Sequence, residues 1–573
     1  MMRKSMTIFW NKAEAVMHRV CSDPRGNVTK LLLRTILRTC SSMEIRLVLC
    51  ATLALTAEPS VAKLSPAPLF NHNMVVQRDR KVAVWGDADP LANVTVGFGG
   101  NVVSCAVSED GCWRVDLPPM QAEAMPQTMT IKSTSGEVFV CTNVVVGEVW
   151  LCGGQSNMTL SMCPKPSVGR HAGRERNGYF DINLTNEPDV RGVRVSERFG
   201  VEPTKRSRLN WFTFTSGNGS NFSGAAWHYA LRLYGALKIP VGVIESAWGG
   251  STIETWISAE AFASSKSFRE FATRPIRTVP NAAERARQEK TGRKPSLHQQ
   301  PRACWNAMIH PLIPYGLRGA IWYQGCANRR RWRDYYELLE ILRAGWSSEF
   351  ECPNMPFFLC QIAPYGYTEE EEDDGDVQIR EEMARFAHDY APNVGMAVLS
   401  DVGEIDCIHP GDKRTVGTRL AALALNRVYG MTNIKCDAPE LESAKMSKDE
   451  KTVLLTFRNV EDWCLSGNYR LRFELAGSDG KYEIVDCRVI SKSNRVELIV
   501  PDGLSPKSVA YMRKSCVYGF LKNEAGLPLG PFRCGIVGQN DNKGRSPSCA
   551  GVPFVEEEKG TSHNEKFNSS DKK

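Results

Sequence analysis

The feature of this chain that most restricts its fold is an alternation of short apolar runs and longer amphipathic stretches between residues 144 and 435. The apolar runs predict buried strands, and the longer stretches predict helices. Because the runs are apolar on both sides and are separated by helices, they indicate a parallel sheet with helices on both faces. The predicted strands are 144–151, 239–245, 319–323, 356–362 and 394–400, and the predicted helices are 225–238, 335–346, 377–388 and 414–429.

The segments on either side of this region have the shorter alternation that is typical of β structure. Short runs separated by turn residues predict a small β-sandwich before residue 144. The same alternation returns after residue 435, and two polar insertions, 163–225 and 270–303, interrupt the central region. We therefore expect an N-terminal β-sandwich domain at 63–143, an α/β catalytic domain at 144–435, a C-terminal β domain at 436–539 and a disordered tail at 540–573.

The first 62 residues have the pattern of a basic extension followed by a signal peptide. Residues 1–42 are basic, and residues 47–57 form an apolar run that is too short to span a bilayer. The small residues Ser60 and Ala62 follow at the two positions that a signal peptidase reads. We predict a signal peptide at 43–62, with Met43 as the suspected start of translation; a signal anchor or a chance apolar run is the alternative.

Composition agrees with a secreted or lysosomal protein. Sixteen of the 19 cysteines follow residue 62, an even number that allows disulfide pairing. Glycosylation acceptors of the form Asn-X-Ser/Thr stand at Asn93, Asn183, Asn218 and Asn221, whereas the matching Asn157 lies in a motif that we expect to be buried. The formal charge is only +7 over 573 residues, and no apolar run reaches 18 residues. We therefore expect neither a nucleic-acid partner nor a membrane span in the mature chain.

Polar clusters follow directly after four of the predicted strands. They are centred on Ser156, on Gly249 and Gly250, on Asn328, and on Asp406 with His409. Ligands of open α/β sheets bind outside the carboxyl ends of the strands, so we expect these clusters to converge. A carboxylate three residues before a histidine can hold the imidazole Nδ1–H and leave Nε2 as a base.

Each cluster alone also has an ordinary structural explanation. Ser156 at a strand-to-helix turn is as often a helix N-cap, paired glycines usually form a turn, and an isolated asparagine favours turns. A lone histidine is often a surface residue or a metal ligand, although no histidine and cysteine cluster with zinc spacing occurs. Met158 replaces the last glycine of the G-x-S-x-G motif, which argues against an α/β-hydrolase.

The four clusters, in this order along the chain, resemble the SGNH (GDSL-like) hydrolase superfamily. Within it the chain is similar to the sialate O-acetylesterase family. The similar segments are Gly-Glu-Val-Trp-Leu-Cys-Gly-Gly-Gln-Ser-Asn-Met at 147–158, Trp-Gly-Gly at 248–250, Trp-Tyr-Gln-Gly at 322–325 and Ile-His-Pro at 408–410, with weaker likeness at 68–78 and 518–532. The resemblance spans nearly all of the expected mature chain and implies an SGNH-hydrolase-like parallel sheet.

The resemblance also implies a serine esterase that works without a metal or another cofactor. Ser156 would be the nucleophile, and His409 would be the general base and then the general acid. Asp406 would orient the imidazole. The implied oxyanion hole consists of the backbone N–H of Ser156, a backbone N–H of Gly249 or Gly250, and the side-chain amide of Asn328.

Two features of the third cluster depart from the family or go beyond it. Cys326 stands where related sequences typically have a glutamate, which puts the rigidity of the loop or a substrate contact in question. An Arg-Arg-Arg-Trp-Arg run follows at 329–333, and is either a solvated basic loop or a clamp for an anionic sugar carboxylate. Candidate substrate-binding residues are Gln155, Gln324, Arg329 and Arg330.

The resemblance implies an esterase that removes O-acetyl groups from a carbohydrate, with O-acetylated sialic acids or sialoglycans as the expected substrates. A related alternative is a deacetylase of acetylated xylan or another polysaccharide, because the motifs act on the acetyl group and not on the sugar. A catalytically silent glycan-binding protein is the third possibility, and Cys326 is its only support. The sequence leaves the acetyl position and the oligomeric state open.

Overall fold

The computed structural model describes residues 63–537, except 162–186, 206, 216–218, 220, 293, 367–374, 405–406, 467–470 and 515–519. The predicted basic extension, signal peptide and disordered tail lie outside the described residues, so they stay predictions. Among the described residues, no helix is both long enough and apolar enough to cross a membrane.

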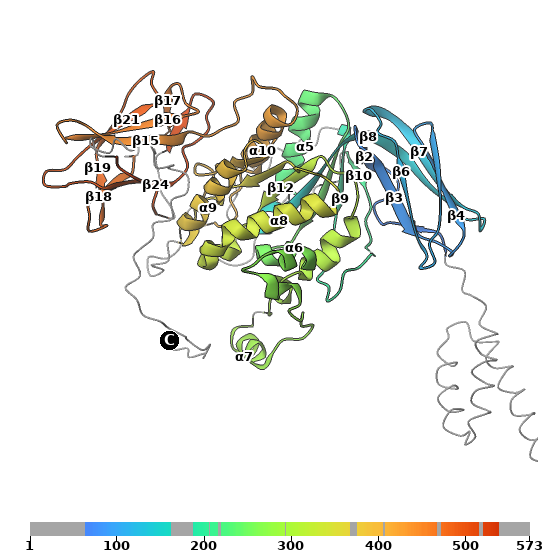
Figure 1. Ribbon diagram of the computed structural model, residues 1–573. Helices are drawn as coiled ribbons and strands as arrows, with labels where there is room; N and C mark the ends of the chain where they lie inside the picture. Colours follow the sequence, from blue (N-terminus) through green and yellow to red (C-terminus); the bar gives the residue numbers. More distant parts are fainter. Residues whose placement is uncertain are drawn as a thin grey trace, which may run out of the picture. The chain divides into compact units, whose positions relative to one another are not determined.

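The centre of the fold is a sheet whose strands follow the order β10-β9-β11-β8-β12-β13-β14 (Figure 1). From β9 to β14 all neighbours pair in parallel, and β10 is an antiparallel edge strand. The predicted parallel sheet is therefore confirmed. Its strands are β8 (Val138–Gly154), β9 (Glu187–Arg194), β10 (Phe212–Phe214), β11 (Val241–Ala247), β12 (Gly319–Tyr323), β13 (Phe357–Cys360) and β14 (Val394–Ala397).

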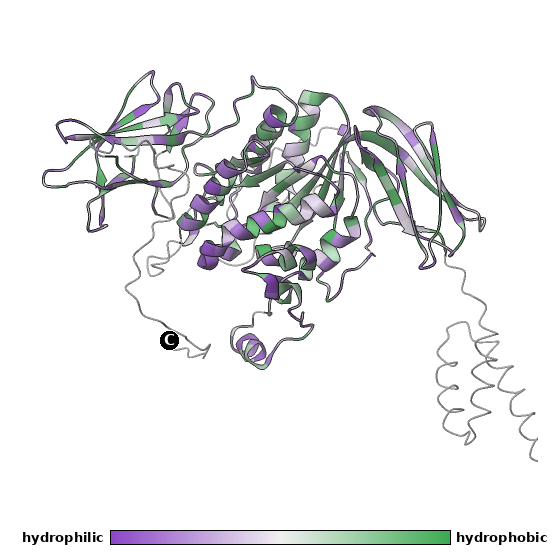
Figure 2. Ribbon diagram, in the orientation of Figure 1, coloured by the Kyte–Doolittle hydropathy of each residue, from purple (hydrophilic) through white to green (hydrophobic). Residues whose placement is uncertain are grey.

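Helices cover both faces of this sheet. Successive side chains of its strands point to opposite faces, so both faces are apolar and each packs against helices. Trp150 of β8 packs among residues of α5 and α10, whereas its neighbour Leu151 belongs to the core that α8 and α9 complete. Figure 2 shows hydrophobic central strands and helices of mixed hydropathy. The α-helices are α4 (Ser156–Thr159), α5 (Gly224–Leu237), α6 (Ala259–Ser264), α7 (Ala282–Thr291), α8 (Tyr335–Glu349), α9 (Gly375–Asp389) and α10 (Lys413–Arg427). The short helices of other types are η1 (Ile253–Trp256), η2 (Arg269–Ala272), η3 (Leu297–Gln299), η4 (Trp305–Ile309), η5 (His310–Leu312) and η6 (Cys326–Asp334).

The long strand β8 belongs both to the N-terminal strands and to the central sheet. Its first part pairs with β7 and β2, and from Glu148 onward it pairs with β11 and β12. The predicted domain boundary between residues 143 and 144 falls inside this strand, so the division into domains remains a prediction. The strands before β8 are β1 (Ser65–Pro66), β2 (Val75–Gln77), β3 (Val82–Asp87), β4 (Asn93–Phe98), β5 (Asn101–Ala106), β6 (Cys112–Leu117) and β7 (Glu123–Ser133).

After α10 the described chain forms three small antiparallel sheets with a hydrophobic core of their own. In β16 the residues Val453, Leu455 and Phe457 are fully buried, as the predicted alternation requires. The strands are β15 (Glu440–Met446), β16 (Thr452–Arg458), β17 (Trp463–Ser466), β18 (Phe473–Ala476), β19 (Tyr482–Val485), β20 (Cys487–Val489), β21 (Arg495–Ile499), β22 (Ser508–Tyr511), β23 (Phe520–Asn523) and β24 (Phe532–Gly535).

Both polar insertions contain elements that the sequence patterns did not predict. The first supplies β9 and β10, and β9 extends the parallel sheet beside β11. The second contains α7, whose start is stabilised by a capping box between Asn281 and Glu284. The helix α7 buries no residue, so it has no apolar stripe that would have predicted it.

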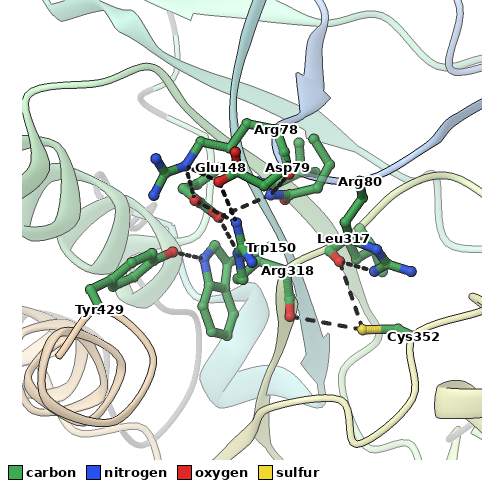
Figure 3. Close-up of polar contacts among 11 residues, drawn as sticks. Arg78, Asp79, Arg80, Glu148, Trp150, Leu317, Arg318, Cys352 and Tyr429 are labelled. Carbon is green, nitrogen blue, oxygen red and sulfur yellow. Dashed lines mark hydrogen bonds and ion pairs between the residues drawn. The ribbon is translucent and has the colours of Figure 1, made fainter. Parts of the chain in front are cut away.

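A buried carboxylate lies at the amino end of the parallel strands (Figure 3). The Glu148 side chain is fully buried and accepts hydrogen bonds from Nε of Arg78 at 2.5 Å and from Nε and Nη2 of Arg318 at 2.7 and 3.0 Å. Nε2 of Gln77 adds a fourth at 3.1 Å. Arg78 directly follows β2 and Arg318 directly precedes β12. Glu148 of β8 therefore links the residues next to β2 and β12, two strands that pair with β8.

Most of the cysteines that the structure describes are free thiols. Burial raises the pKa of Cys141 and of Cys304 to about 12, so these two behave as small apolar side chains. The even number of cysteines allowed disulfide pairing, but the cysteines named next are free thiols in the structure and form no disulfide. They are Cys105, Cys112, Cys141, Cys152, Cys304, Cys326, Cys352, Cys360, Cys407, Cys436, Cys464 and Cys487.

Candidate active site

Ser156 and His409 meet at the carboxyl ends of the central strands. Ser156 is the first residue of α4, directly after β8, and His409 lies in the loop between β14 and α10. Nε2 of His409 is 2.8 Å from Oγ of Ser156, and both residues are half-buried. At this distance the imidazole can take the hydroxyl proton as the oxygen attacks a substrate.

The glycine pair of the second cluster lies beside this serine. A Cβ atom added to Gly249 would be 3.6 Å from Cβ of Ser156. The turn is tied to the end of β8, because the N–H of Trp248 donates to the Gly154 carbonyl at 3.1 Å. Gly250 has a φ of 73°, which glycine adopts without strain. No backbone carbonyl of a described residue accepts a hydrogen bond from the N–H of Gly249 or Gly250, which agrees with the oxyanion role that the family resemblance implies.

The amide of Asn328 is fully buried and held on three sides. Its Oδ1 accepts hydrogen bonds from the N–H of Ile253 at 3.0 Å and from Nε2 of Gln324 at 2.8 Å. Its Nδ2 donates to Oε2 of Glu254 at 3.0 Å. An amide nitrogen has two hydrogens, so one of them remains for the oxyanion role that the family resemblance implies.

The two glutamines that we predicted to bind substrate hold the loop after β12. Oε1 of Gln155 accepts hydrogen bonds from the N–H groups of Gly325 and Ala327 at 3.2 and 3.3 Å. Oε1 of Gln324 accepts one from the hydroxyl of Tyr335 at 2.8 Å. Gln155 is 4% exposed and Gln324 is fully buried. These contacts therefore give both glutamines a structural role in the wall of the site.

Glu254 is a part of the site that the sequence patterns did not single out, although it ends the second cluster. It is 2% exposed, and its Oε1 lies 2.5 Å from Nη1 of Arg331. Within the arginine run, Arg331 is thus engaged in an internal ion pair, Arg329 is half-buried and Arg330 is exposed. The glutamate links the arginine run to the Asn328 amide.

A cavity of about 420 Å³ opens beside this ion pair. Glu254, Arg331, Arg277 and Gln299 are among the residues that line it. Nε2 of Gln299 also donates to the carbonyl of Gly250 at 2.6 Å. The cavity therefore adjoins the glycine turn, and its polar lining suits a hydroxyl-rich ligand.

The carboxylate that we predicted for the triad, Asp406, lies outside the described residues, and its role stays a prediction. Asp401 is at the start of the same loop and accepts hydrogen bonds from Arg419 at 2.6 and 2.8 Å. Nζ of Lys522 lies 2.7 Å from Oδ2 of Asp401, one of the two oxygens that Arg419 contacts. Burial alone would raise the pKa of Asp401, but these cations outweigh it and hold the pKa below its usual value. The negative charge of Asp401 is thus balanced by Arg419 and Lys522, and not by His409.

Lys413, the first residue of α10, is a second residue that the sequence patterns missed. It is 2% exposed, and Nζ donates to the side chain of Asn157 and to the carbonyl of Pro410. These partners are the neighbours of Ser156 and His409 in the chain. Lysines at a helix start are usually solvated, so nothing in the sequence marked this one.

The chain is similar in sequence to curated esterases. It is 30% identical over 440 residues to the sialate O-acetylesterase of Rattus norvegicus, which covers 68% of this chain and 78% of the relative. The chain belongs to the sialate O-acetylesterase family. The Homo sapiens sialate O-acetylesterase is 28% identical over 416 residues, covering 68% of this chain and 76% of the relative. No protein-family model matches the chain.

A solved structure agrees with this family assignment. It is described as a carbohydrate acetylesterase from Xanthomonas citri and superposes with a TM-score of 0.68 at 27% identity. The match covers 83% of this chain and 99% of the other chain. The predicted SGNH-hydrolase-like fold is therefore confirmed along with the family.

In this member of the sialate O-acetylesterase family, Cys326 lies in a loop that neighbouring side chains hold. Cys326 begins η6, and burial raises its pKa to about 11, so the thiol stays uncharged. The loop is held instead by Gln155 and, through Asn328, by Glu254. The contacts of Gln155 hold the loop backbone at Gly325 and Ala327, on either side of Cys326.

Proposed function

We propose that this protein is a serine esterase that hydrolyses O-acetyl esters of carbohydrates, with O-acetylated sialic acids as its substrates. The 2.8 Å hydrogen bond between His409 and Ser156 is the observation that carries the proposal. The names of the curated relatives support the sialic acid, and the description of the Xanthomonas citri structure supports a carbohydrate ester.

In the first half of the proposed reaction, Oγ of Ser156 bonds to the acetyl carbon while its proton passes to Nε2 of His409. The carbonyl oxygen gains the negative charge in the tetrahedral intermediate. When this intermediate collapses, the bond between the acetyl carbon and the sugar oxygen breaks, and His409 gives its proton to that oxygen. The products are a free sugar hydroxyl and an acetyl-serine enzyme.

In the second half, a water molecule replaces the sugar. His409 takes a proton from the water as its oxygen attacks the acetyl carbon, and returns the proton to Oγ when the acyl bond breaks. Acetate and free Ser156 result. Asp406 is proposed to hold the imidazole in the tautomer that both halves require.

The proposed oxyanion donors come from the segments that follow strands β8, β11 and β12. The N–H of Ser156 lies at the start of α4, where a helix leaves its first N–H groups without partners inside the helix. The N–H groups of Gly249 and Gly250 and the remaining hydrogen of Asn328 Nδ2 complete the set. Losing one such donor typically costs on the order of 100-fold in kcat.

The sugar is proposed to lie against the cavity beside the glycine turn. Sialic acids carry a carboxylate, and Arg329 and Arg330 are the proposed contacts for it. If Arg330→Ala raises KM for an acetylated sialic acid but not for an aryl acetate, this contact is supported. Equal effects on both substrates would contradict it.

The test of the proposed function is acetate release by protein expressed from Lys63, with a Ser156→Ala variant as the control. Turnover of O-acetylated sialic acid that the control loses supports both the nucleophile and the substrate. Turnover of an aryl acetate or acetylated xylan but not of the sialic acid keeps the esterase and rejects the substrate. Glycan binding without turnover of any of the three rejects the esterase in favour of a binding protein.

The secretory route is also part of the proposal. Of the predicted glycosylation acceptors, Asn93 and Asn221 are exposed in the structure, while Asn157 is 2% exposed. Expression of the full chain in a eukaryotic cell should give a secreted or lysosomal product whose mass falls on treatment with an N-glycosidase. A product that stays in the cytosol without glycans would contradict this route.

A further inference from the structure

The loop that carries His409 is held at the residues on both sides of the histidine. Nζ of Lys413 donates to the carbonyl of Pro410 at 2.9 Å. Nδ2 of Asn157 donates to the carbonyl of Ile408 at 3.0 Å. Both fixed carbonyls belong to the immediate neighbours of the histidine. The backbone of His409 therefore has little freedom to move toward or away from the serine.

The same two side chains are joined to each other and to the nucleophile. Nζ of Lys413 donates to Oδ1 of Asn157 at 2.8 Å, so the Asn157 amide is used from both ends. Asn157 directly follows Ser156 in α4. The chain of contacts thus runs from the backbone beside the nucleophile, through two side chains, to the backbone on both sides of the base.

The position of Lys413 is costly for a cation, which indicates that its contacts matter. The residue is 2% exposed, and its two hydrogen-bond partners are neutral oxygens. Removal from water therefore lowers its pKa from the ordinary value of 10.5 to about 8. A methionine or leucine would fill the same space without that cost, so packing alone does not explain the residue.

We propose that Lys413 and Asn157 form a clamp that sets the distance between His409 and Ser156, with Lys413 acting as a positioning residue. This inference rests on the proposed roles of Ser156 and His409. Its physical basis is that proton transfer requires a hydrogen-bond distance between base and nucleophile, while the described residues around His409, 408–412, lie in no helix or strand that could provide it. The clamp replaces that missing rigidity.

The first test compares Lys413→Met with Arg191→Met. Arg191 is a matched control because it is also 2% exposed and donates to backbone carbonyls, but it lies in β9 and contacts Met74 and Asn143. With an aryl acetate, we expect kcat of Lys413→Met to fall on the order of 100-fold with KM changed less than about threefold. The control should keep kcat within about twofold of wild type.

A double-mutant cycle separates a clamp from two independent effects. If Lys413 and Asn157 act as one unit, Lys413→Met and Asn157→Leu each lower kcat, and the double variant is no worse than the poorer single variant. Losses that multiply would overturn the clamp. Should Lys413→Met not fold, Asn157→Leu breaks the same link from the other side, and an unchanged kcat in that variant would overturn the proposal.

A structural readout keeps the clamp separate from the proposed function. Crystal structures of wild type and Lys413→Met should show the Ser156 Oγ to His409 Nε2 contact intact in the first and beyond hydrogen-bond distance in the second. An unchanged contact in the variant overturns the clamp even if the enzyme proves to be an acetylesterase. A lost contact supports the clamp even if no acetyl ester is hydrolysed, which would be a failure of the proposed function alone.

Discussion

The two ends of strand β8 use buried polar groups in opposite ways. At the amino end, Glu148 is saturated: its two oxygens accept four hydrogen bonds from Arg78, Arg318 and Gln77. At the carboxyl end, Ser156 and His409 are half-buried and share one hydrogen bond. The same strand therefore carries a closed ionic cluster at one end and an open pair at the other.

The difference separates stability from chemistry. A buried charge with all of its partners in place stabilises the packing of β2, β8 and β12 but has no capacity left for a ligand. The open pair is half-buried and therefore accessible to a substrate, and the proposed oxyanion donors at Gly249 and Gly250 would form hydrogen bonds in the transition state. Changes at the two ends should therefore affect different measurements.

The largest effect is expected at the open end. In His409→Ala the serine has no base, and we expect kcat to fall by about 10⁴-fold or more with the melting temperature nearly unchanged. Steady-state kinetics with an aryl acetate and calorimetry would measure both quantities. A variant that keeps a tenth of the wild-type kcat would contradict the role of His409.

The closed end should show the opposite result. Glu148→Ala removes the buried carboxylate from the half-buried Arg78 and Arg318. Among the described residues these two keep only the more distant Asp79 as an ionic partner, at 3.4 and 3.6 Å. We therefore expect the free energy of unfolding to fall by about 3–5 kcal/mol. The kcat per folded molecule should stay within about twofold of wild type. Urea denaturation measures the first quantity and active-site titration the second.

Glu351→Ala is the matched control for this change. Glu351 pairs with Arg114 at 2.6 Å, but its side chain is 55% exposed. Such a surface pair is expected to contribute less than about 1 kcal/mol. If both variants lose the same stability, the buried cluster at Glu148 has no special role and the comparison of the two ends fails.

Lys413 gives the comparison a pH dependence. Its pKa is about 8 in the folded protein and near 10.5 when exposed, so between these values the unfolded chain binds more protons. Stability from this group therefore rises with pH across that window, by roughly 2–4 kcal/mol in total. Activity should fall over the same window, because an uncharged amine makes weaker hydrogen bonds to Asn157 and Pro410.

Other groups around Lys413 titrate as well, so the measurement must be a difference. The titratable side chains that face Lys413 are those of Cys360, Glu404, Cys407 and Cys326. The ring of Tyr323 and, from α5, the backbone of Gly224 pack against the lysine. Buried thiols such as Cys326 have raised pKa values and contribute stability that is lost as pH rises. Subtracting the pH profile of Lys413→Met from that of wild type isolates the lysine. A flat difference between pH 7 and 10.5 would contradict the prediction.

The smallest effect is expected where the two kinds of site overlap, at Glu254. Glu254→Gln keeps the shape of the side chain but removes the charge that pairs with Arg331 and orients Asn328. We expect kcat to fall about tenfold and stability to fall by less than about 2 kcal/mol. A loss of stability without a loss of kcat would show that Glu254, like Glu148, has a structural role and no role in catalysis.

Local patterns in the sequence predicted the central fold well. The strand Gly319–Tyr323 has the predicted bounds, and α8 begins at the predicted Tyr335. These elements have clear apolar periodicity, which depends only on residues a few positions apart. The strand β9 and the helix α7 were missed because their sequences are polar, and β9 is defined by its pairing with β11.

The sequence by itself determined the order of those central strands and helices that have clear apolar periodicity, the family, and the strand ends at which Ser156 and His409 stand. Only the tertiary structure decided that these two are 2.8 Å apart, that Glu254 holds Asn328, and that Lys413 is buried beneath the pair. The physical reason is distance along the chain. Periodicity is a property of neighbouring residues, whereas the hydrogen bond between Ser156 and His409 joins positions 253 residues apart, which only the folded sheet brings together.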